Sequence, residues 1–306
     1  MQTGYSTHPT YPFPIPHLPA SLSTALISLP EPGTGRAIDD RPDLDLLYFE
    51  PYVSRAAAGE LFRFLRSSLP FYRVEYDIRR GGGGMVTHIR TPRWTTVFGV
   101  DETSRFSPDG RVVDASTGTP ASADTKYYAR YPPRPIPRCL DELRRSAEAA
   151  TGCTFNFCLV NYYASGADSI SYHSDDERFL GPRPAIASFS LGATRDFLMK
   201  HKSASVKEGP RTNEKGGGSV AADKPLKLPL ASGDMVLMRG TTQANWLHSI
   251  PKRSGRNEHD GGRINITFRR AMVKGGTENY YNYNVGNGPV YRWDAVNREM
   301  KQWNPQ

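Results

Sequence analysis

Short segments in which apolar and polar residues alternate make up most of the ordered part of this chain, and glycine turns separate them. This period of two is typical of β-strands that bury one face. Many short strands joined by tight turns favour a two-layer β-sandwich or jelly roll. The predicted strands are 72–76, 94–98, 155–163, 185–191, 195–200, 226–230, 235–239 and 263–269.

Two segments have helical spacing of their apolar residues. In 54–69 the apolar positions are Leu61, Phe62, Leu65 and Leu69, which lie on one face of a helix. Ser54 is a suitable N-cap, and the helix is expected to end before Pro70. A second helix is predicted over 138–150. The fold class is therefore mainly β with flanking helices.

The pattern weakens at both ends of the chain and in one internal stretch. The N-terminal part is rich in Pro, Ser and Thr, which predicts a disordered tail; the alternative is that Tyr11, Phe13 and Ile15 dock on the body. The C-terminal part is rich in Tyr and Asn and is expected to wrap the body. We divide the chain into a tail (1–43), an N-terminal helical part (44–150), a β core (151–273) with a polar, flexible insertion (202–224), and an extension (274–306).

Length and charge add limits. A chain of 306 residues suits one large domain, and its formal charge of +8 fits a polyanionic partner such as nucleic acid, or solubility alone. Three cysteines are too few for a disulfide framework and fit a reducing compartment. No segment approaches the ~18 apolar residues of a membrane span, and no secretory signal is evident. We therefore expect an intracellular monomer.

A possible metal site comes from His173-Ser174-Asp175 together with the distant His248. Residues two apart on a strand point to one face, so one ion can contact both His173 and Asp175. Two imidazoles and one carboxylate are the ligand set of non-haem Fe(II) oxygenases, and they leave positions open for other ligands. Each piece also has a structural interpretation, because an isolated H-x-D or a single His is common without a metal.

The strand 263–269 carries a second signal. Arg263, Asn265, Thr267 and Arg269 alternate with apolar residues, which predicts a half-buried strand with one polar face. Two inward arginines are costly without an anion, and arginine binds carboxylates through two parallel hydrogen bonds. A dicarboxylate bound beside the metal would satisfy both; the alternative is an exposed edge strand.

With these motifs in place, the chain resembles the AlkB family of Fe(II)/2-oxoglutarate dioxygenases, and most of all its nuclear DNA-repair branch. The close likeness covers about 155–271, and a looser one begins near Leu46. The matching stretches are Asn161-Tyr-Tyr163, His173-Ser-Asp175-Asp-Glu177, 184–190, 192–197, His248-Ser-Ile-Pro251 and 263–269.

The resemblance implies a double-stranded β-helix that uses Fe(II), 2-oxoglutarate and O2. It implies that His173, Asp175 and His248 bind iron. It also implies that Asn161, Tyr163 and Arg263 hold the distal carboxylate of 2-oxoglutarate, with Asn265 and Arg269 near its metal-chelating end. For Tyr163 and Asn161 the alternatives are a core aromatic residue and a buried amide that needs hydrogen bonds in any fold.

The implied activity is oxidative removal of methyl groups from 1-methyladenine and 3-methylcytosine in DNA, with release of formaldehyde and succinate, in the nucleus. By resemblance, Glu177 would contact the damaged base and Phe98 would stack on it; Glu177 could instead be a surface acid. An RNA or N6-methyladenine demethylase, a non-catalytic module that binds modified nucleic acid, and a protein hydroxylase remain open.

Overall fold

The computed structural model describes residues 4–27, 35–80, 85–120, 128, 130–202, 225–253 and 261–304. The predicted glycine loop at 81–84 lies outside the described residues. So does the predicted flexible insertion, except for Lys202.

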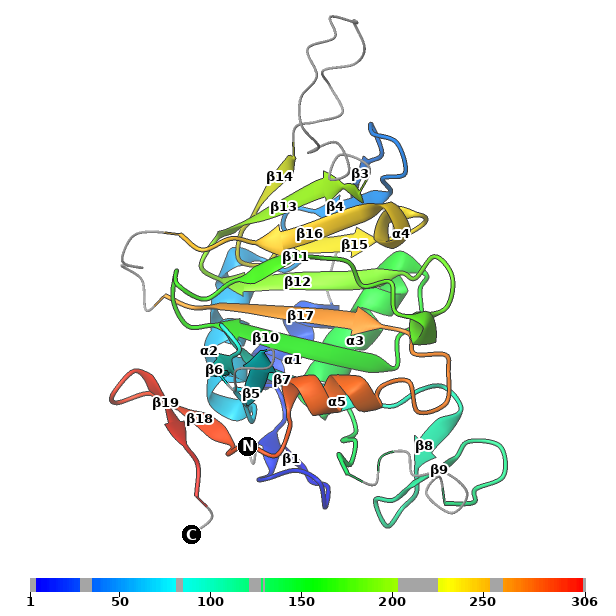
Figure 1. Cartoon of the computed structure of the whole chain (residues 1–306), viewed down its shortest axis with the longest axis vertical. Helices are drawn as coiled ribbons and strands as arrows, with labels where there is room; N and C mark the ends of the chain where they lie inside the picture. Colours follow the sequence, from blue (N-terminus) through cyan, green and yellow to red (C-terminus); the bar gives the residue numbers. More distant parts are fainter. Residues whose placement is uncertain are drawn as a thin grey trace, which may run out of the picture.

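Two facing β-sheets form the body of the protein (Figure 1). They confirm the predicted double-stranded β-helix with flanking helices. The larger sheet has the strand order β3 (Arg36–Ile38), β4 (Leu46–Phe49), β15 (Met235–Met238), β12 (Ile186–Gly192), β17 (Arg263–Arg269), β10 (Phe157–Tyr163) and β7 (Trp94–Gly99). The smaller sheet has the order β11 (Ile170–His173), β16 (Trp246–Ile250), β13 (Arg195–His201) and β14 (Leu226–Leu230).

Helices cover one face of the larger sheet, as Figure 1 shows for α1 (Ala20–Ile27), α2 (Arg55–Ser68) and α3 (Arg138–Thr151). The predicted helices correspond to α2 and α3. The Ser54 hydroxyl accepts a hydrogen bond from the Ala57 N–H at 3.3 Å and so caps α2 as expected. Apolar residues of these helices share one core with Ile264, Ile266 and Phe268 of β17.

Alternate residues of the central strands face the second sheet instead. A second apolar core there contains Val97, Leu159, Phe197 and Val236. The polar residues of β17 turn to this side, and the whole strand is buried, so the expectation of a half-buried strand is wrong. Helices cover its apolar face, and the smaller sheet covers its polar face. Any site built on β17 therefore lies between the two sheets.

The N-terminal segment is a correction to the predicted disordered tail. Residues 4–27 form β1 (Tyr5–Ser6), β2 (Ile15–Pro16) and α1. Ile15, Leu22 and Leu26 belong to the core shared with α2 and α3, and the Tyr11 hydroxyl donates to the Pro135 carbonyl at 2.7 Å. Burial of these apolar side chains offsets the conformational entropy that the segment loses when it becomes ordered. The docking alternative is the one observed.

The remaining elements lie around the sheets. The strand predicted over 72–76 is largely displaced: β5 begins at Glu75, and Tyr72 makes only an isolated bridge to Thr95. No helix of the described residues is long and apolar enough to cross a membrane. The elements are β5 (Glu75–Arg80) paired with β6 (Met85–Arg90), β8 (Ser104–Phe106) paired with β9 (Val112–Asp114), a 3-10 turn (Arg178–Leu180), α4 (Thr242–Asn245), α5 (Glu278–Asn284), and β18 (Tyr291–Asp294) paired with β19 (Glu299–Gln302).

Truncation of Ile15 tests whether the N-terminal segment belongs to the fold. Ile15 is 0% exposed and Ile27 is 84% exposed, so Ile27→Ala is a matched control for Ile15→Ala. We expect Ile15→Ala to lower the free energy of unfolding by about 2 kcal/mol or more, and Ile27→Ala by less than about 0.5 kcal/mol, measured by urea denaturation. If Ile15→Ala lowers the free energy of unfolding by as little as Ile27→Ala does, packing of this segment adds nothing to stability.

Candidate active site

Adjacent strands bring the two predicted histidine ligands together. β11 and β16 are antiparallel neighbours, and their register places His173 directly opposite His248. The ring centroids are 4.2 Å apart. Asp175 follows the end of β11 by two residues, and one ligand atom from each of the three side chains lies within 4.8 Å of the others. Three ligands on one side leave the remaining positions of a six-coordinate ion open.

Hydrogen bonds orient two of the three ligands. His173 Nδ1 lies 2.9 Å from the Ser171 carbonyl oxygen, and an N–H donated there leaves Nε2 as the metal-binding atom. The Asp175 backbone N–H donates to Gln243 Oε1 at 2.9 Å. Asp175 Oδ2 accepts a hydrogen bond from Arg269 Nη2 at 2.6 Å, while Oδ1 is the oxygen nearer to His173 Nε2, at 3.9 Å.

Electrostatics holds these groups in the protonation states that a cation needs. Burial alone would raise the pKa of Asp175, but the Arg269 guanidinium and the two imidazoles hold it at about 2. Burial, with the neighbouring His173, lowers the pKa of His248 to about 3. At neutral pH the carboxylate is ionised and the His248 imidazole is neutral, which are the metal-binding forms. The donor set thus fits a divalent iron ion.

The polar face of β17 meets polar residues of β10 across the strand pair. The register sets Asn265 opposite Asn161 and Arg263 opposite Tyr163. All four side chains line the same cavity as the triad, with Arg269, and its volume is about 940 Å³. The structure therefore brings together all eight residues that the sequence assigned to iron and 2-oxoglutarate.

Arg263 is the least satisfied charge in this cavity. It is fully buried, and Nη2 donates to Ser190 Oγ at 2.8 Å. Nε and Nη1 have no hydrogen-bond partner in the described part of the chain. Burial lowers the pKa of Arg263 to about 10, and Tyr163 opposes this, so the side chain stays cationic at neutral pH. A buried cation with two free donors fits an anionic ligand.

Arg269 and Asn265 are held more fully by the protein. Besides Asp175, Arg269 donates from Nη1 to Thr267 Oγ1 at 2.7 Å. Asn265 Nδ2 donates to Ser188 Oγ at 2.9 Å and to the Phe189 carbonyl at 2.8 Å. Arg269 is therefore first of all a positioning partner of the carboxylate ligand, and Asn265 is left with its amide oxygen for a ligand.

The two predicted base contacts differ in outcome. Glu177 lines the cavity, where burial and the nearby Asp175 raise its pKa. Phe98 is 0% exposed and packs in the helix-side core, edge-on to Tyr11. The expectation that Phe98 stacks on a base is wrong, because alternation along β7 turns Phe98 to the helices and Val97 to the inter-sheet side.

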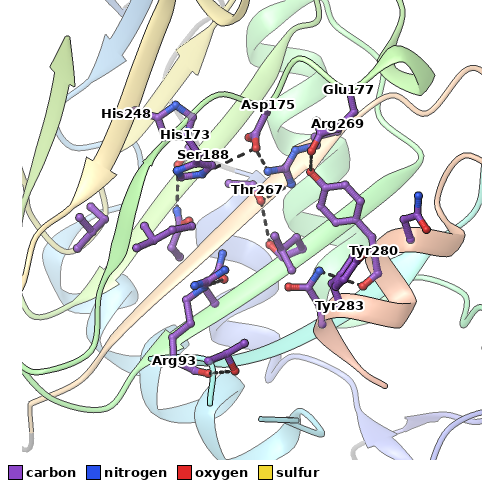
Figure 2. Close-up of a pocket in the computed structure, with 18 of the residues that line it drawn as sticks. Arg93, His173, Asp175, Glu177, Ser188, His248, Thr267, Arg269, Tyr280 and Tyr283 are labelled. Atoms are coloured by element: carbon purple, nitrogen blue, oxygen red, sulfur yellow. Dashed lines mark hydrogen bonds and ion pairs between the residues drawn. The ribbon is translucent and has the colours of Figure 1, made fainter. Parts of the chain in front are cut away.

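Sequence reasoning missed three residues that line the cavity, and Figure 2 shows all three. Arg93 lies just before β7 and donates from Nε to Asn161 Oδ1 at 2.8 Å. A buried Asn161 needs a partner, which was the available signal. Tyr280 and Tyr283 come from α5 and also line the cavity. No motif marked them, because the Tyr- and Asn-rich extension gave no indication of which face it presents.

Comparison with known proteins agrees with this geometry. The model of the 2OG-Fe(II) oxygenase superfamily matches residues 45–269. The DNA oxidative demethylase ALKBH2 of Arabidopsis thaliana is 31% identical over 267 residues, which cover 81% of this chain and 75% of that protein. ALKBH2 of Homo sapiens is 39% identical over 46% of this chain, and alkB homolog 3 of Rattus norvegicus is 40% identical over 46%. The match spans about half the length of these last two, 49% and 45%.

Removal of His173 tests the metal site directly. We expect His173→Ala to weaken Mn(II) binding at pH 7 by about 100-fold or more, since loss of even an outer partner of a ligand costs 10–100-fold. Isothermal titration calorimetry with Mn(II), which stands in for Fe(II) without oxidising, measures this. His17→Ala, remote from the triad, is the control and should bind as the parent does. Unchanged affinity in His173→Ala would rule out the site.

Proposed function

The chain belongs to the 2OG-Fe(II) oxygenase superfamily, in its AlkB-like branch, and we propose that it removes methyl groups from ring nitrogens of nucleobases in DNA. As a member of this family it is a 2-oxoglutarate-dependent dioxygenase that requires Fe(II), 2-oxoglutarate and O2. The observation that carries the proposal is one cavity that combines the triad, a buried unsatisfied arginine and an acid suited to a cationic base.

We assign the iron to His173, Asp175 and His248. The distal carboxylate of 2-oxoglutarate is assigned to Arg263, with Asn161 and Tyr163 beside it. Nε and Nη1 of Arg263 have no hydrogen-bond partner among the described residues. This supports the assignment, because a buried guanidinium with unpaired N–H groups needs an anionic acceptor. Asn265 and Arg269 lie toward the chelating end, since Arg269 holds the iron ligand Asp175.

Replacement of Arg263 by lysine tests the carboxylate assignment. Lysine keeps the charge but cannot donate two parallel hydrogen bonds, and a hydrogen bond to a charged group contributes about 1.5–3 kcal/mol. We expect Arg263→Lys to raise the Kd for 2-oxoglutarate about tenfold or more in calorimetry with Mn(II)-loaded protein. Arg270→Lys, at an exposed residue just beyond the end of β17 that pairs with Glu102, should leave the Kd unchanged. Equal Kd values for both variants would refute the assignment.

When bound, iron with 2-oxoglutarate and O2 supplies the oxidation of the N-methyl group, after which formaldehyde leaves and the unmodified base remains. The residues of this chain bind and orient the reactants and limit the access of water. Arg269 keeps the Asp175 carboxylate ionised and aimed at the metal position. Glu177, two residues beyond Asp175, places a carboxyl group on the same cavity.

Glu177 favours a cationic base as the substrate. Methylation at N1 of adenine or at N3 of cytosine gives a base that carries positive charge and an exocyclic amino group. A carboxylate stabilises such a cation and can accept a hydrogen bond from the amino group. 1-Methyladenine and 3-methylcytosine are therefore the proposed substrates, and a DNA substrate favours a nuclear location.

The second candidate is an RNA or N6-methyladenine demethylase of the same family. The name of the Arabidopsis relative, which matches most of this chain, specifies DNA, and this favours the first proposal. A non-catalytic binding module has no need of the complete triad with its orienting hydrogen bonds. A protein hydroxylase has no evident use for an acid placed to meet a cationic base. The monomeric state stays a prediction.

Mass spectrometry of methylated oligonucleotides tests the function. Iron-loaded protein, with 2-oxoglutarate, is given single- and double-stranded DNA and RNA that carry 1-methyladenine, 3-methylcytosine or N6-methyladenine. We expect methyl loss, matched by succinate, to be fastest for the two cationic bases in DNA, and absent in His173→Ala. Fresh protein that turns over 2-oxoglutarate but leaves every methyl group intact would overturn the proposal. Faster turnover of RNA or N6-methyladenine would favour the second candidate.

A further inference from the structure

Helix α5 forms a wall of the active-site cavity, although it lies beyond the segment that the superfamily model matches, 45–269. Its residues Asn279, Tyr280, Tyr283 and Asn284 line the cavity together with the iron triad. The helix is anchored to the larger sheet, because the Thr95 hydroxyl donates to the Asn284 carbonyl oxygen at 2.6 Å. The C-terminal extension is thus part of the site.

Tyr280 makes the most specific contact of this wall. Its hydroxyl donates to Glu177 Oε1 at 2.7 Å, as Figure 2 shows. Its ring lies edge-on to Phe157 and Phe179, at centroid distances of 5.2 and 5.6 Å, and 5.5 Å from the Arg269 guanidinium carbon. The ring is therefore fixed on several sides, and its hydroxyl is a rigid donor to the carboxylate.

This contact divides the two oxygens of Glu177 between different tasks. Oε1 is engaged by Tyr280, whereas Oε2 is buried and has no hydrogen-bond partner among the described residues. A buried carboxylate oxygen without a partner needs a donor. The exocyclic amino group of a methylated adenine or cytosine supplies one, whereas 3-methylthymine presents a carbonyl oxygen that a carboxylate repels.

Tyr283 extends the same wall to solvent. It lines the cavity and is 62% exposed, so its ring is open to solvent at the edge of the cavity. An exposed ring at the entrance of a basic protein's cavity offers a stacking surface for a base. Phe98, the aromatic residue that the sequence assigned to this task, is buried on the other side of the sheet.

We propose that helix α5 of the C-terminal extension sets base specificity: Tyr280 positions Glu177 to receive an amino-bearing methylated base, and Tyr283 stacks on the nucleotide at the entrance. This inference rests on the proposed demethylase function. Tyr280 is a positioning residue, since it acts through Glu177, and Tyr283 is a binding residue. Neither role requires a change in the iron or 2-oxoglutarate sites.

Tyr280→Phe tests the positioning role, because it removes only the hydroxyl and keeps the packed ring. We expect the preference for 1-methyladenine over 3-methylthymine, measured as a ratio of kcat/KM, to fall about tenfold, while the Kd for 2-oxoglutarate stays within twofold. In a Glu177→Ala background the same change should have no further effect. A ratio that is unchanged in Tyr280→Phe, or an equal loss in both backgrounds, would refute the positioning role.

Tyr283 is tested by binding rather than turnover, so that the result stands apart from the demethylase proposal. Fluorescence anisotropy is measured for a single-stranded 1-methyladenine oligonucleotide on Mn(II)- and 2-oxoglutarate-loaded protein. We expect Tyr283→Ala to weaken binding about five- to tenfold and Tyr283→Phe to restore it. Tyr5→Ala is the control, since Tyr5 is 57% exposed and does not line the cavity. Equal binding by Tyr283→Ala and the parent would refute the stacking role. The expected loss of binding in Tyr283→Ala, together with no demethylation by the parent protein, would refute the proposed function but not the stacking role.

Discussion

The buried ion pair between Asp175 and Arg269 connects the fold of this protein to its chemistry. The two side chains lie 2.6 Å apart, and both are almost fully buried. Either charge alone would be very costly at this depth. Together they keep the carboxylate ionised for a metal and tie the end of β11 to the last residue of β17. The smaller sheet, which carries both histidines, is thereby held over the polar face of the larger one.

The alternation of side chains between the two faces of a β-strand explains which parts of the site could be predicted from the sequence. Arg263, Asn265 and Arg269 occupy every second position of β17, so the period of two placed them on one face before the fold was known. His173 and Asp175 were expected on one face for the same reason and do lie close together, although Asp175 is two residues beyond the end of β11. Phe98 was assigned by resemblance, and the alternation along its own strand places it on the opposite face. The side of the strand on which Phe98 lies was thus more reliable evidence for its role than its resemblance to an aromatic position of the family.

The terminal segments could not be predicted, for a different physical reason. Proline-rich residues 4–27 and the Tyr- and Asn-rich extension lack a periodic pattern, and their order comes from tertiary contacts. Ile15 packs in the core that the helices share with the larger sheet. Tyr280 contacts Phe157 of β10, Arg269 of β17 and Glu177. Such contacts join positions far apart in sequence, where local propensity carries no information. The strands and the pair His173 and Asp175 gave local or periodic signals, whereas the residues of α5 that wall the cavity gave none.

The direct opposition of His173 and His248 across β11 and β16 also makes the iron site a check on strand register. A slip of one residue in either strand turns its histidine to the opposite face, and the chelate is lost. Iron binding therefore adds stability to the native register alone. Chains that pair wrongly lack the complete chelate, so the geometry that creates the site also restricts metal binding there to correctly paired molecules.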